Sequence, residues 1–154
     1  ACADLVTIAQ ALHWFDLEKF YGEVRRVLKP NGLIAAWTYG MIKINHPKAN
    51  KCLQDFYHEV IGPYWPPERH HVETGYRELD FPFERIDTPN LSMHREWTAS
   101  HLMGYLRSWS ATARYHEKTG MDPVEELSDQ LIPLLDSPAQ LLQIYWPLSI
   151  LAGR

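Results

Sequence analysis

The 154-residue sequence predicts an α/β protein built around a buried parallel sheet. Two short apolar runs, from Leu5 to Ala9 and from Leu33 to Thr38, carry this prediction together with the helical pattern between them. Neither run alternates apolar and polar residues, which is typical of strands covered on both faces. A strand, a helix and a strand within about 35 residues form a βαβ unit with parallel strands and a right-handed crossover.

The helix between the two runs is expected from residue 17 to about residue 29. Asp16 precedes it as a favourable N-cap. One face carries apolar residues at helical spacing, namely Leu17, Phe20, Tyr21, Val24, Val27 and Leu28. Pro30 cannot continue a helix, and Asn31 and Gly32 tolerate positive φ, so we expect the chain to turn there into the second run.

The rest of the chain should add helices and two more strand regions to a single domain. In order, the pattern predicts a helix over 48–61, an ordered loop over 66–83, one or two strands over 84–97, a helix over 98–118, a helix from 123 that Pro133 ends or kinks, and a strand over 141–151. Asp122 before Pro123 is expected to cap the helix from 123. Pro147 implies a bulge or an edge position in that last strand. We therefore expect the domain to consist of three parts: a βαβ unit (1–40), a helix and loop insertion (41–83), and terminal strands with intervening lid helices (84–154).

Composition excludes several classes of function. The net charge is −4 with a pI near 6.0, which leaves no electrostatic footprint for nucleic acid. The longest apolar stretch, residues 141–152, is interrupted and too short to span a membrane. Two cysteines are too few for a disulfide framework, and no signal peptide is visible, so a cytoplasmic location is expected.

The polar turn after the first run is the first place to look for a ligand site. In open α/β sheets, ligands bind beyond the carboxyl ends of the strands. Gln10, His13 and Trp14 occupy that position. Six Trp and eight Tyr in so short a chain also indicate either a large aromatic core or an aromatic-lined pocket.

Two segments together resemble the middle of class I S-adenosylmethionine-dependent methyltransferases. They are Asp-Leu-Val-Thr-Ile-Ala-Gln-Ala-Leu-His-Trp-Phe at 4–15 and Val-Leu-Lys-Pro-Asn-Gly at 27–32, in which Asn31 stands where the family has glycine. The nearest branch is the small-molecule group that includes trans-aconitate methyltransferase. Similar pieces follow, at Gly75-Tyr76-Arg77, Gly104-Tyr105-Leu106 and Trp146-Pro147-Leu148, so the resemblance spans nearly the whole chain.

The resemblance implies a Rossmann-like sheet in which this chain supplies the strands equivalent to 4, 5, 7 and 6, with an added helical lid. It also implies S-adenosylmethionine as cofactor, held by Gln10, Ala11, His13 and Trp14, and a small-molecule methyl acceptor held by Tyr39, Trp65, Tyr105 and Trp109. It assigns no catalytic residue, because alignment of donor and acceptor does most of the work in methyl transfer. The simpler interpretation of these aromatic residues is that they fill the core of the fold.

The resemblance also implies a missing part. The family's Gly-rich cofactor loop has no counterpart, since no two of the eight glycines form a G-x-G. The chain therefore looks like a C-terminal half, expected to be inactive alone. Loss of the neighbouring strand would leave the edge from Leu5 to Ala9 unpaired, so we expect a homo-oligomer, a strand swap, or pairing with a missing N-terminal half.

Two other functions stay open at this stage. One is a non-catalytic ligand-binding or assembly module derived from such a methyltransferase. The other is a half-enzyme completed by a separate N-terminal chain. A metal site at His70, His71 and Glu73 is not expected, because adjacent residues point to different sides and no further ligand has a suitable spacing.

Overall fold

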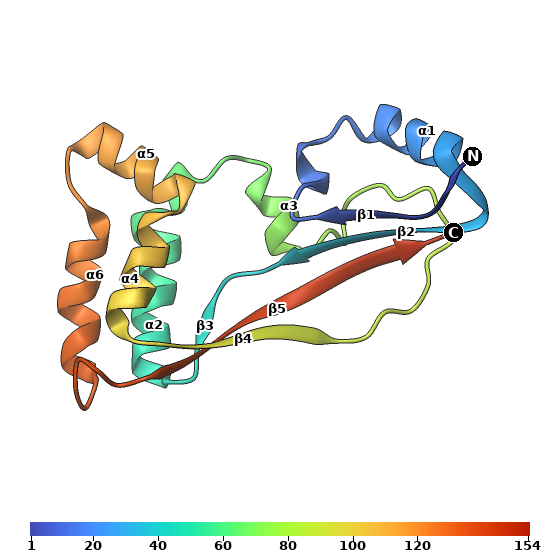
Figure 1. The fold of residues 1–154 in the computed structure, drawn as a ribbon. Coiled ribbons are helices and arrows are strands. Elements are labelled where there is room, and N and C mark those ends of the chain that lie inside the picture. The colour runs from blue at the N-terminus through green and yellow to red at the C-terminus, as the bar shows by residue number, and fades with distance from the viewer. The chain divides into compact units, whose positions relative to one another are not determined.

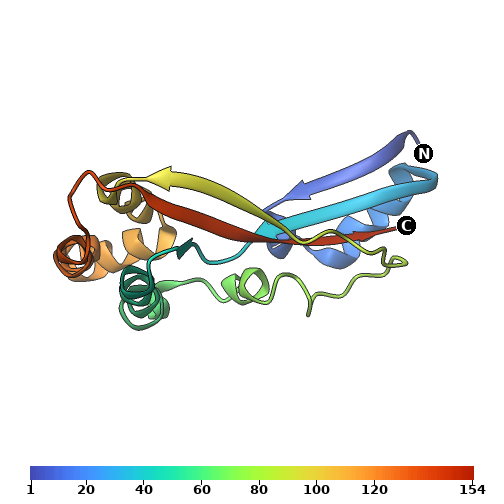
Figure 2. The same ribbon diagram turned by 90° about the horizontal axis from the view of Figure 1, so that it is seen from below.

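The computed structural model describes residues 1–154 and divides them into two compact units. Unit 1 contains Ala1–Met41, Pro67–Met93 and Trp146–Arg154. Unit 2 contains Ile42–Pro66 and His94–Tyr145. Figures 1 and 2 show the strands of unit 1 side by side and the helices of unit 2 packed together.

Unit 1 begins with the βαβ unit that the sequence predicts. Strand β1 (Ala3–Ala9) runs parallel to β2 (Leu28–Tyr39), and helix α1 (Leu17–Val27) connects them. Asp16 caps α1, because its carboxylate accepts a hydrogen bond from the backbone N–H of Lys19 at 3.3 Å. β2 starts earlier than predicted, since Ala3 pairs with Leu28 before an irregularity in the register.

Strand β5 (Leu142–Gly153) lies on the other side of β2 and runs antiparallel to it. This pairing ends with Tyr39 opposite Leu148, and pairing with the short strand β3 (Lys43–Ile44) begins opposite Tyr145. Pro147 was expected at a bulge or an edge, and it lies at a bulge, because three residues (40–42) face two residues (146–147) between the two pairings. The proline lies in the gap between the two pairings, where no partner needs its missing N–H, and its carbonyl accepts from the backbone N–H of Gly40 at 3.0 Å.

Only one face of β1 is covered by residues of this chain. Ile8 and Ile34 share the covered face, where they pack with Tyr21 and Val24 of α1 and with Val72, Tyr76, Leu79, Phe81 and Leu151. The opposite face of β1 carries Leu5, Thr7 and Ala9, which are exposed, Leu5 to 52%. The expectation that both faces of the first run are covered is therefore not met within these residues.

Residues 67–93 complete unit 1. The predicted loop over 66–83 holds a short helix, α3 (Arg69–Glu73), after which Gly75 and Tyr76 both adopt positive φ, 62° and 63°. The next strand, β4 (Leu91–Trp97), pairs with β5. The order of β1, β2, β5 and β4 in the sheet is the order 4, 5, 7, 6 that the resemblance implied.

Unit 2 is mainly helical. Its helices are α2 (Pro47–Asp55), which continues as a π-helix over Phe56–Val60, then α4 (Ala99–Arg107), α5 (Ser110–Thr119) and α6 (Pro123–Leu131), and short 3-10 turns lie at Gly62–Tyr64 and Ile132–Leu134. Asp122 caps α6 as predicted, accepting from the N–H of Val124 at 2.9 Å. No helix is long and apolar enough to cross a membrane.

The prediction of one helix over 98–118 is wrong. The backbone of Trp109 is extended, with φ −73° and ψ 138°, and it separates α4 from α5. The last carbonyls of α4 also accept side-chain hydrogen bonds. Ser108 Oγ donates to the Tyr105 carbonyl at 2.6 Å, and Thr112 Oγ1 donates to that of Leu106 at 2.9 Å. The bend lets Trp109 pack against other aromatic rings of unit 2.

Candidate functional site at the carboxyl ends of β1 and β2

Gln10 joins the carboxyl ends of the two parallel strands. Its backbone has a φ of 52°, unusual for a residue other than glycine, and its N–H donates to the Trp37 carbonyl at 2.8 Å. Its side-chain amide oxygen accepts two hydrogen bonds, from Thr38 Oγ1 at 2.8 Å and from the backbone N–H of Tyr39 at 2.9 Å. The side chain is therefore held in one position against the end of β2.

Tyr76 lies beside this pair and is fully buried. Its hydroxyl oxygen is 2.9 Å from Nδ1 of His13, and it also hydrogen-bonds with the side chain of Thr38 and the backbone of Leu12 and His13. Burial raises the pKa of Tyr76 above its ordinary value, against the opposing effect of these hydrogen bonds. The phenol therefore keeps its proton at neutral pH.

The turn before Tyr76 requires glycine. Gly75 has a φ of 62°, and a Cβ added there would overlap the side chain of Ser149 in β5. Tyr76 follows directly with its own positive φ. Two residues in the left-handed region, one of them bulky, store backbone strain of the kind that clusters at functional sites.

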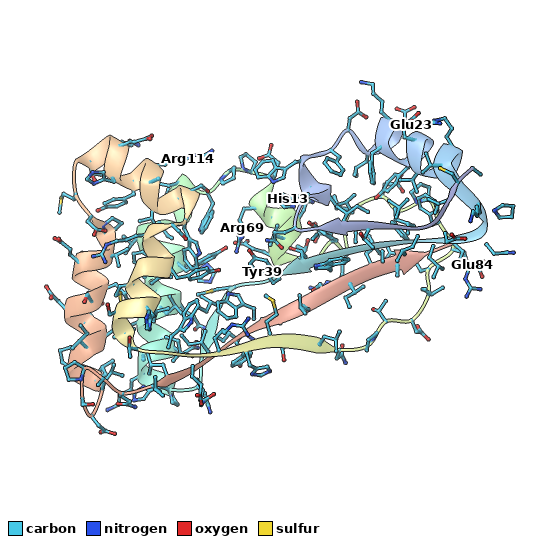
Figure 3. All side chains as sticks on the ribbon, in the orientation of Figure 1. His13, Glu23, Tyr39, Arg69, Glu84 and Arg114 are labelled. Atoms are coloured by element: carbon cyan, nitrogen blue, oxygen red, sulfur yellow. The ribbon has the colours of Figure 1, made fainter.

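His13 lies between Tyr76 and Trp14. The centroid of its ring is 5.9 Å from that of Tyr76 and 4.7 Å from that of Trp14, which is 57% exposed. Partial burial lowers the pKa of His13, and the positive charges of Arg69 and His71 lower it further, while Glu68 opposes them. His13 is therefore neutral at physiological pH. Figure 3 labels His13, Arg69 and Tyr39 around this end of the strands.

His71 contributes a second imidazole near His13. Its Nδ1 is buried and has no hydrogen-bond partner in the structure. A buried polar atom in that condition calls for an explanation, such as a water or a ligand group. The histidines at 70 and 71 do not act as a pair, because His70 instead contacts Glu78 at 2.8 Å. No group of three or more His, Cys, Asp or Glu residues is placed to hold a metal ion.

The four residues predicted to contact a cofactor all lie in this turn. Gln10 and Ala11 follow β1, and His13 and Trp14 belong to the 3-10 helix Leu12–Trp14. Ala11 packs against the core of unit 1, and the side chain of Gln10 is occupied by β2. Trp14 presents the largest exposed surface of the four.

The residues predicted to bind a substrate separate into two places. Tyr39 ends β2 in unit 1. Trp65, Tyr105 and Trp109 come together in unit 2, with ring centroids 5.5 Å apart for Trp65 and Trp109 and 5.6 Å apart for Tyr105 and Trp109. Tyr57, which sequence reasoning did not single out, completes this group from the π-helix, 5.4 Å from Trp65.

Sequence reasoning also missed the residues that surround Gln10 and His13. Thr38 lay inside an apolar run, and Tyr76, His71 and Arg69 lay in a predicted loop. The Gly75-Tyr76 pair was the one available signal, because a glycine before an aromatic residue in a polar segment marks a turn that a buried ring could follow.

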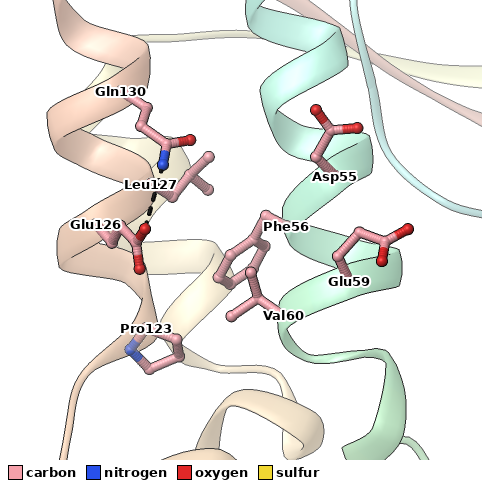
Figure 4. A pocket seen from close by; sticks show the side chains of 8 residues that line it. All are labelled: Asp55, Phe56, Glu59, Val60, Pro123, Glu126, Leu127 and Gln130. Atoms are coloured by element: carbon pink, nitrogen blue, oxygen red, sulfur yellow. Dashed lines mark hydrogen bonds between the residues drawn. The ribbon is translucent and has the colours of Figure 1, made fainter.

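Two cavities lie away from this turn. The larger, about 510 Å³, is in unit 1 near both chain termini, and its lining includes Arg25, Lys29, Phe83 and Arg154. The smaller, about 140 Å³, is a groove in unit 2 between α2 with its π-helical extension and α6 (Figure 4). Apolar Phe56 and Leu127 form part of its lining, and Asp55, Glu59 and Glu126 make its rim acidic.

Comparisons with known proteins agree with the fold. Residues 1–36 match a family described as a methyltransferase domain. A protein of Dictyostelium discoideum that carries the name of a methyltransferase is 31% identical over 156 residues, which cover 98% of this chain and 59% of that protein. A solved structure from Anaeromyxobacter dehalogenans, described as a type II methyltransferase, matches with a TM-score of 0.92 and 40% identity, over 100% of this chain and 65% of that one.

The fold is accordingly the Rossmann-like α/β fold of methyltransferases. All three matches are to methyltransferases, which agrees with the resemblance of residues 4–15 and 27–32. The chain spans about three fifths of the length of these relatives.

Proposed function

We propose that these residues belong to a methyltransferase that transfers a methyl group from S-adenosylmethionine to a small molecule. The observation that carries this proposal is the turn after β1, which presents an exposed Trp14 and a neutral His13. Hydrogen bonds hold this turn in place, from Thr38 to Gln10 and between His13 and Tyr76. Ligand sites of open α/β sheets lie at this position, beyond the carboxyl ends of the strands.

The side chains and backbone of the turn after β1 fit part of this cofactor. When bound, S-adenosylmethionine would supply a methyl group on a positively charged sulfur, and a cation of that kind is attracted to the face of an indole ring. Trp14 offers such a ring, and the backbone of Gln10 and Ala11 lies beside it. The chain has no G-x-G loop, so we propose that the turn forms one wall of the cofactor site.

We propose that the methyl acceptor is bound by aromatic side chains, for which Tyr39 in unit 1 and the group of Tyr57, Trp65, Tyr105 and Trp109 in unit 2 are two separate candidate places. Flat aromatic walls give a large contact area with few rotatable bonds. The π-helix that carries Tyr57 supports this role, because such irregular turns occur frequently at functional sites.

One observation favours a second function, a non-catalytic assembly module. β1 hydrogen-bonds on one side only and leaves an apolar outer face, which suits association with another chain. Affinity for the cofactor distinguishes the two proposals, because a non-catalytic assembly module does not need to bind S-adenosylmethionine.

Calorimetric titration with S-adenosylhomocysteine tests the proposed function. We expect micromolar binding to the 154-residue chain, weakened roughly tenfold by Trp14→Ala because the ligand loses its apolar contact with the indole ring. Phe15→Ala is the matched control, since Phe15 is a neighbouring exposed ring that packs on Phe20 rather than on His13. No detectable heat, or equal affinity of the Trp14→Ala variant, would contradict the proposal.

A further inference from the structure

The groove between α2 with its π-helix and α6 has an apolar floor. Figure 4 shows Phe56 and Val60 extending from the π-helix towards α6, and Leu127 extending from α6 towards them. Phe56 and Leu127 are buried, so they form the bottom of the groove, and Val60 is more exposed. Such a floor gains free energy when an apolar group of another molecule covers it.

Acidic side chains lie on both sides of this floor. Asp55 and Glu59 belong to α2 and the π-helix, and Glu126 belongs to α6. All three residues are exposed. Asp55 is neutralised within its own helix, because Lys51 Nζ forms an ion pair with its carboxylate at 2.7 Å.

No lysine or arginine of this chain pairs with Glu59 or Glu126. Neither residue takes part in a salt bridge. Ion pairs along a helix form between residues three or four positions apart, and none of the residues at those positions around Glu59 or Glu126 is Lys or Arg. Glu126 accepts a hydrogen bond from the uncharged side-chain amide of Gln130 at 3.4 Å. Two uncompensated carboxylates therefore flank the floor, one on each helix.

The sequence around α6 shows the same excess of negative charge. Residues 119–145 contain no Lys and no Arg, but they contain five acidic residues, namely Asp122, Glu125, Glu126, Asp129 and Asp136. Of these five, Asp122 forms a salt bridge, with Arg107 at 2.7 Å. The α6 side of the groove is therefore complementary to a positively charged group.

The size of the groove limits what can occupy it. Its volume is about 140 Å³, whereas sites for small-molecule ligands usually have about 300–1,000 Å³. A single long side chain from another protein suits such a space. Arginine matches both parts of the groove, because its aliphatic stem can cover apolar surface while its charged end stays in water at the rim.

Arginine also suits the two carboxylates better than lysine does. Its planar guanidinium carries five N–H donors that point in several directions, so it can donate to acceptors on two walls. A lysine ammonium is a compact and strongly hydrated charge, which loses more hydration when it leaves water. Arginine is also one of the residue types that most often anchor protein interfaces.

We propose that this groove is a docking site for another protein, and that it binds an arginine side chain of that partner between Glu59 and Glu126. The stem of the arginine lies on Phe56 and Leu127, and its guanidinium pairs with the two carboxylates. The inference concerns unit 2 alone and goes beyond the proposed function, since it requires no cofactor site at the end of β1.

Backbone amide NMR of the 154-residue chain, with capped pentapeptides as probes, tests this proposal. The peptide acetyl-Gly-Gly-Arg-Gly-Gly-amide offers one side chain and no other anchor. We expect it to shift the signals of Phe56, Glu59, Glu126 and Leu127 in a saturable way, with a Kd of about 1 mM, because one anchored side chain binds weakly. The corresponding citrulline peptide keeps the shape of arginine without its charge and should bind roughly tenfold more weakly.

Substitutions in the rim test which carboxylates take part. Glu59→Gln and Glu126→Gln should each weaken binding of the arginine peptide about two- to fivefold, because each removes one charge from the groove. Glu125→Gln is the matched control. It removes the same charge from an exposed position on the same helix, but Glu125 does not line the groove, so the affinity should stay unchanged.

Four results would overturn the proposal. Equal binding of the arginine and citrulline peptides would remove the role of charge, and equal binding of a lysine peptide would remove the preference for a guanidinium. Equal losses from Glu125→Gln and Glu126→Gln would mean general attraction to an acidic surface. Shifts of the groove signals on raising the protein concentration without peptide would show a second copy of this chain in the groove. Calorimetry with S-adenosylhomocysteine decides the proposed function separately.

Discussion

Thr38 donates its hydroxyl proton to the side-chain oxygen of Gln10 at 2.8 Å, across the carboxyl ends of two parallel strands. Thr38 is fully buried, so this bond has no competition from water. It links the end of β2 to the turn that carries His13 and Trp14.

Replacing this hydroxyl by a methyl group should destabilise unit 1. Thr38→Val keeps the shape of the side chain but removes the donor, and we expect a loss of about 1–3 kcal/mol in the free energy of unfolding, measured in urea. Thr38→Ser keeps the hydroxyl and should lose less than Thr38→Val. If the valine variant were more stable than the serine variant, the hydrogen bond would not contribute to the free energy of unfolding.

The turn at Gly75 should tolerate no side chain. Gly75→Ala places a Cβ against Ser149 at a φ of 62°, so we expect a loss of about 1–3 kcal/mol in unfolding free energy. Gly22 in α1 is the matched control, because a Cβ there meets nothing within 4 Å. Gly22→Ala should stabilise the chain by about 0.5–1 kcal/mol through helix propensity. Equal effects of the two substitutions would rule out a special role for the Gly75 turn.

His13 should make the stability of the chain sensitive to mild acid. Its pKa is lowered in the folded state from 6.5, so between the folded value and 6.5 the unfolded chain binds more protons. Stability therefore rises with pH through this window, and the contribution of His13 is lost as the pH falls through the folded pKa. We expect unfolding midpoints to fall from neutral pH to about pH 5, and to fall less in His13→Gln. An equal fall in the unaltered chain and in His13→Gln would contradict this expectation.

The open edge of β1 should lead to self-association. β1 pairs only with β2, and Leu5 on its outer face is 52% exposed. We expect sedimentation velocity to show dimers or larger species that grow with concentration, and Leu5→Lys to suppress them. Leu141→Lys changes an equally exposed leucine of unit 2, at 56%, and should have no effect. A concentration-independent monomer would contradict this expectation.

The parts of the fold that depend on local pattern could be predicted from the sequence. The βαβ unit followed from two apolar runs with a capped amphipathic helix between them, and the cap of α6 followed from Asp122 and Pro123. The break between α4 and α5 could not be predicted. Ser108 and Trp109 carry no local stop signal, and the extended backbone at Trp109 follows from ring packing with residues distant in the sequence.

Some residues of the candidate site could likewise be predicted from the sequence, and others could not. Gln10, His13 and Trp14 are found by position alone, since they follow a strand at the edge where ligands bind. Tyr76 is 63 residues away from His13, and no periodicity relates the two. The hydrogen bonds that hold Gln10 against Thr38 and Tyr39 join residues 28 and 29 positions apart, so they too require coordinates.

Site-resolved binding of S-adenosylhomocysteine tests the central claim most directly, because it asks where the ligand lies as well as whether it binds. In backbone amide NMR spectra of the 154-residue chain, we expect the ligand to shift the signals of Gln10, Ala11, His13 and Trp14. Signals from the groove between α2 and α6, such as those of Glu59 and Gln130, should stay in place. Shifts confined to that groove, or no shifts at saturating ligand, would contradict a cofactor site at the end of β1.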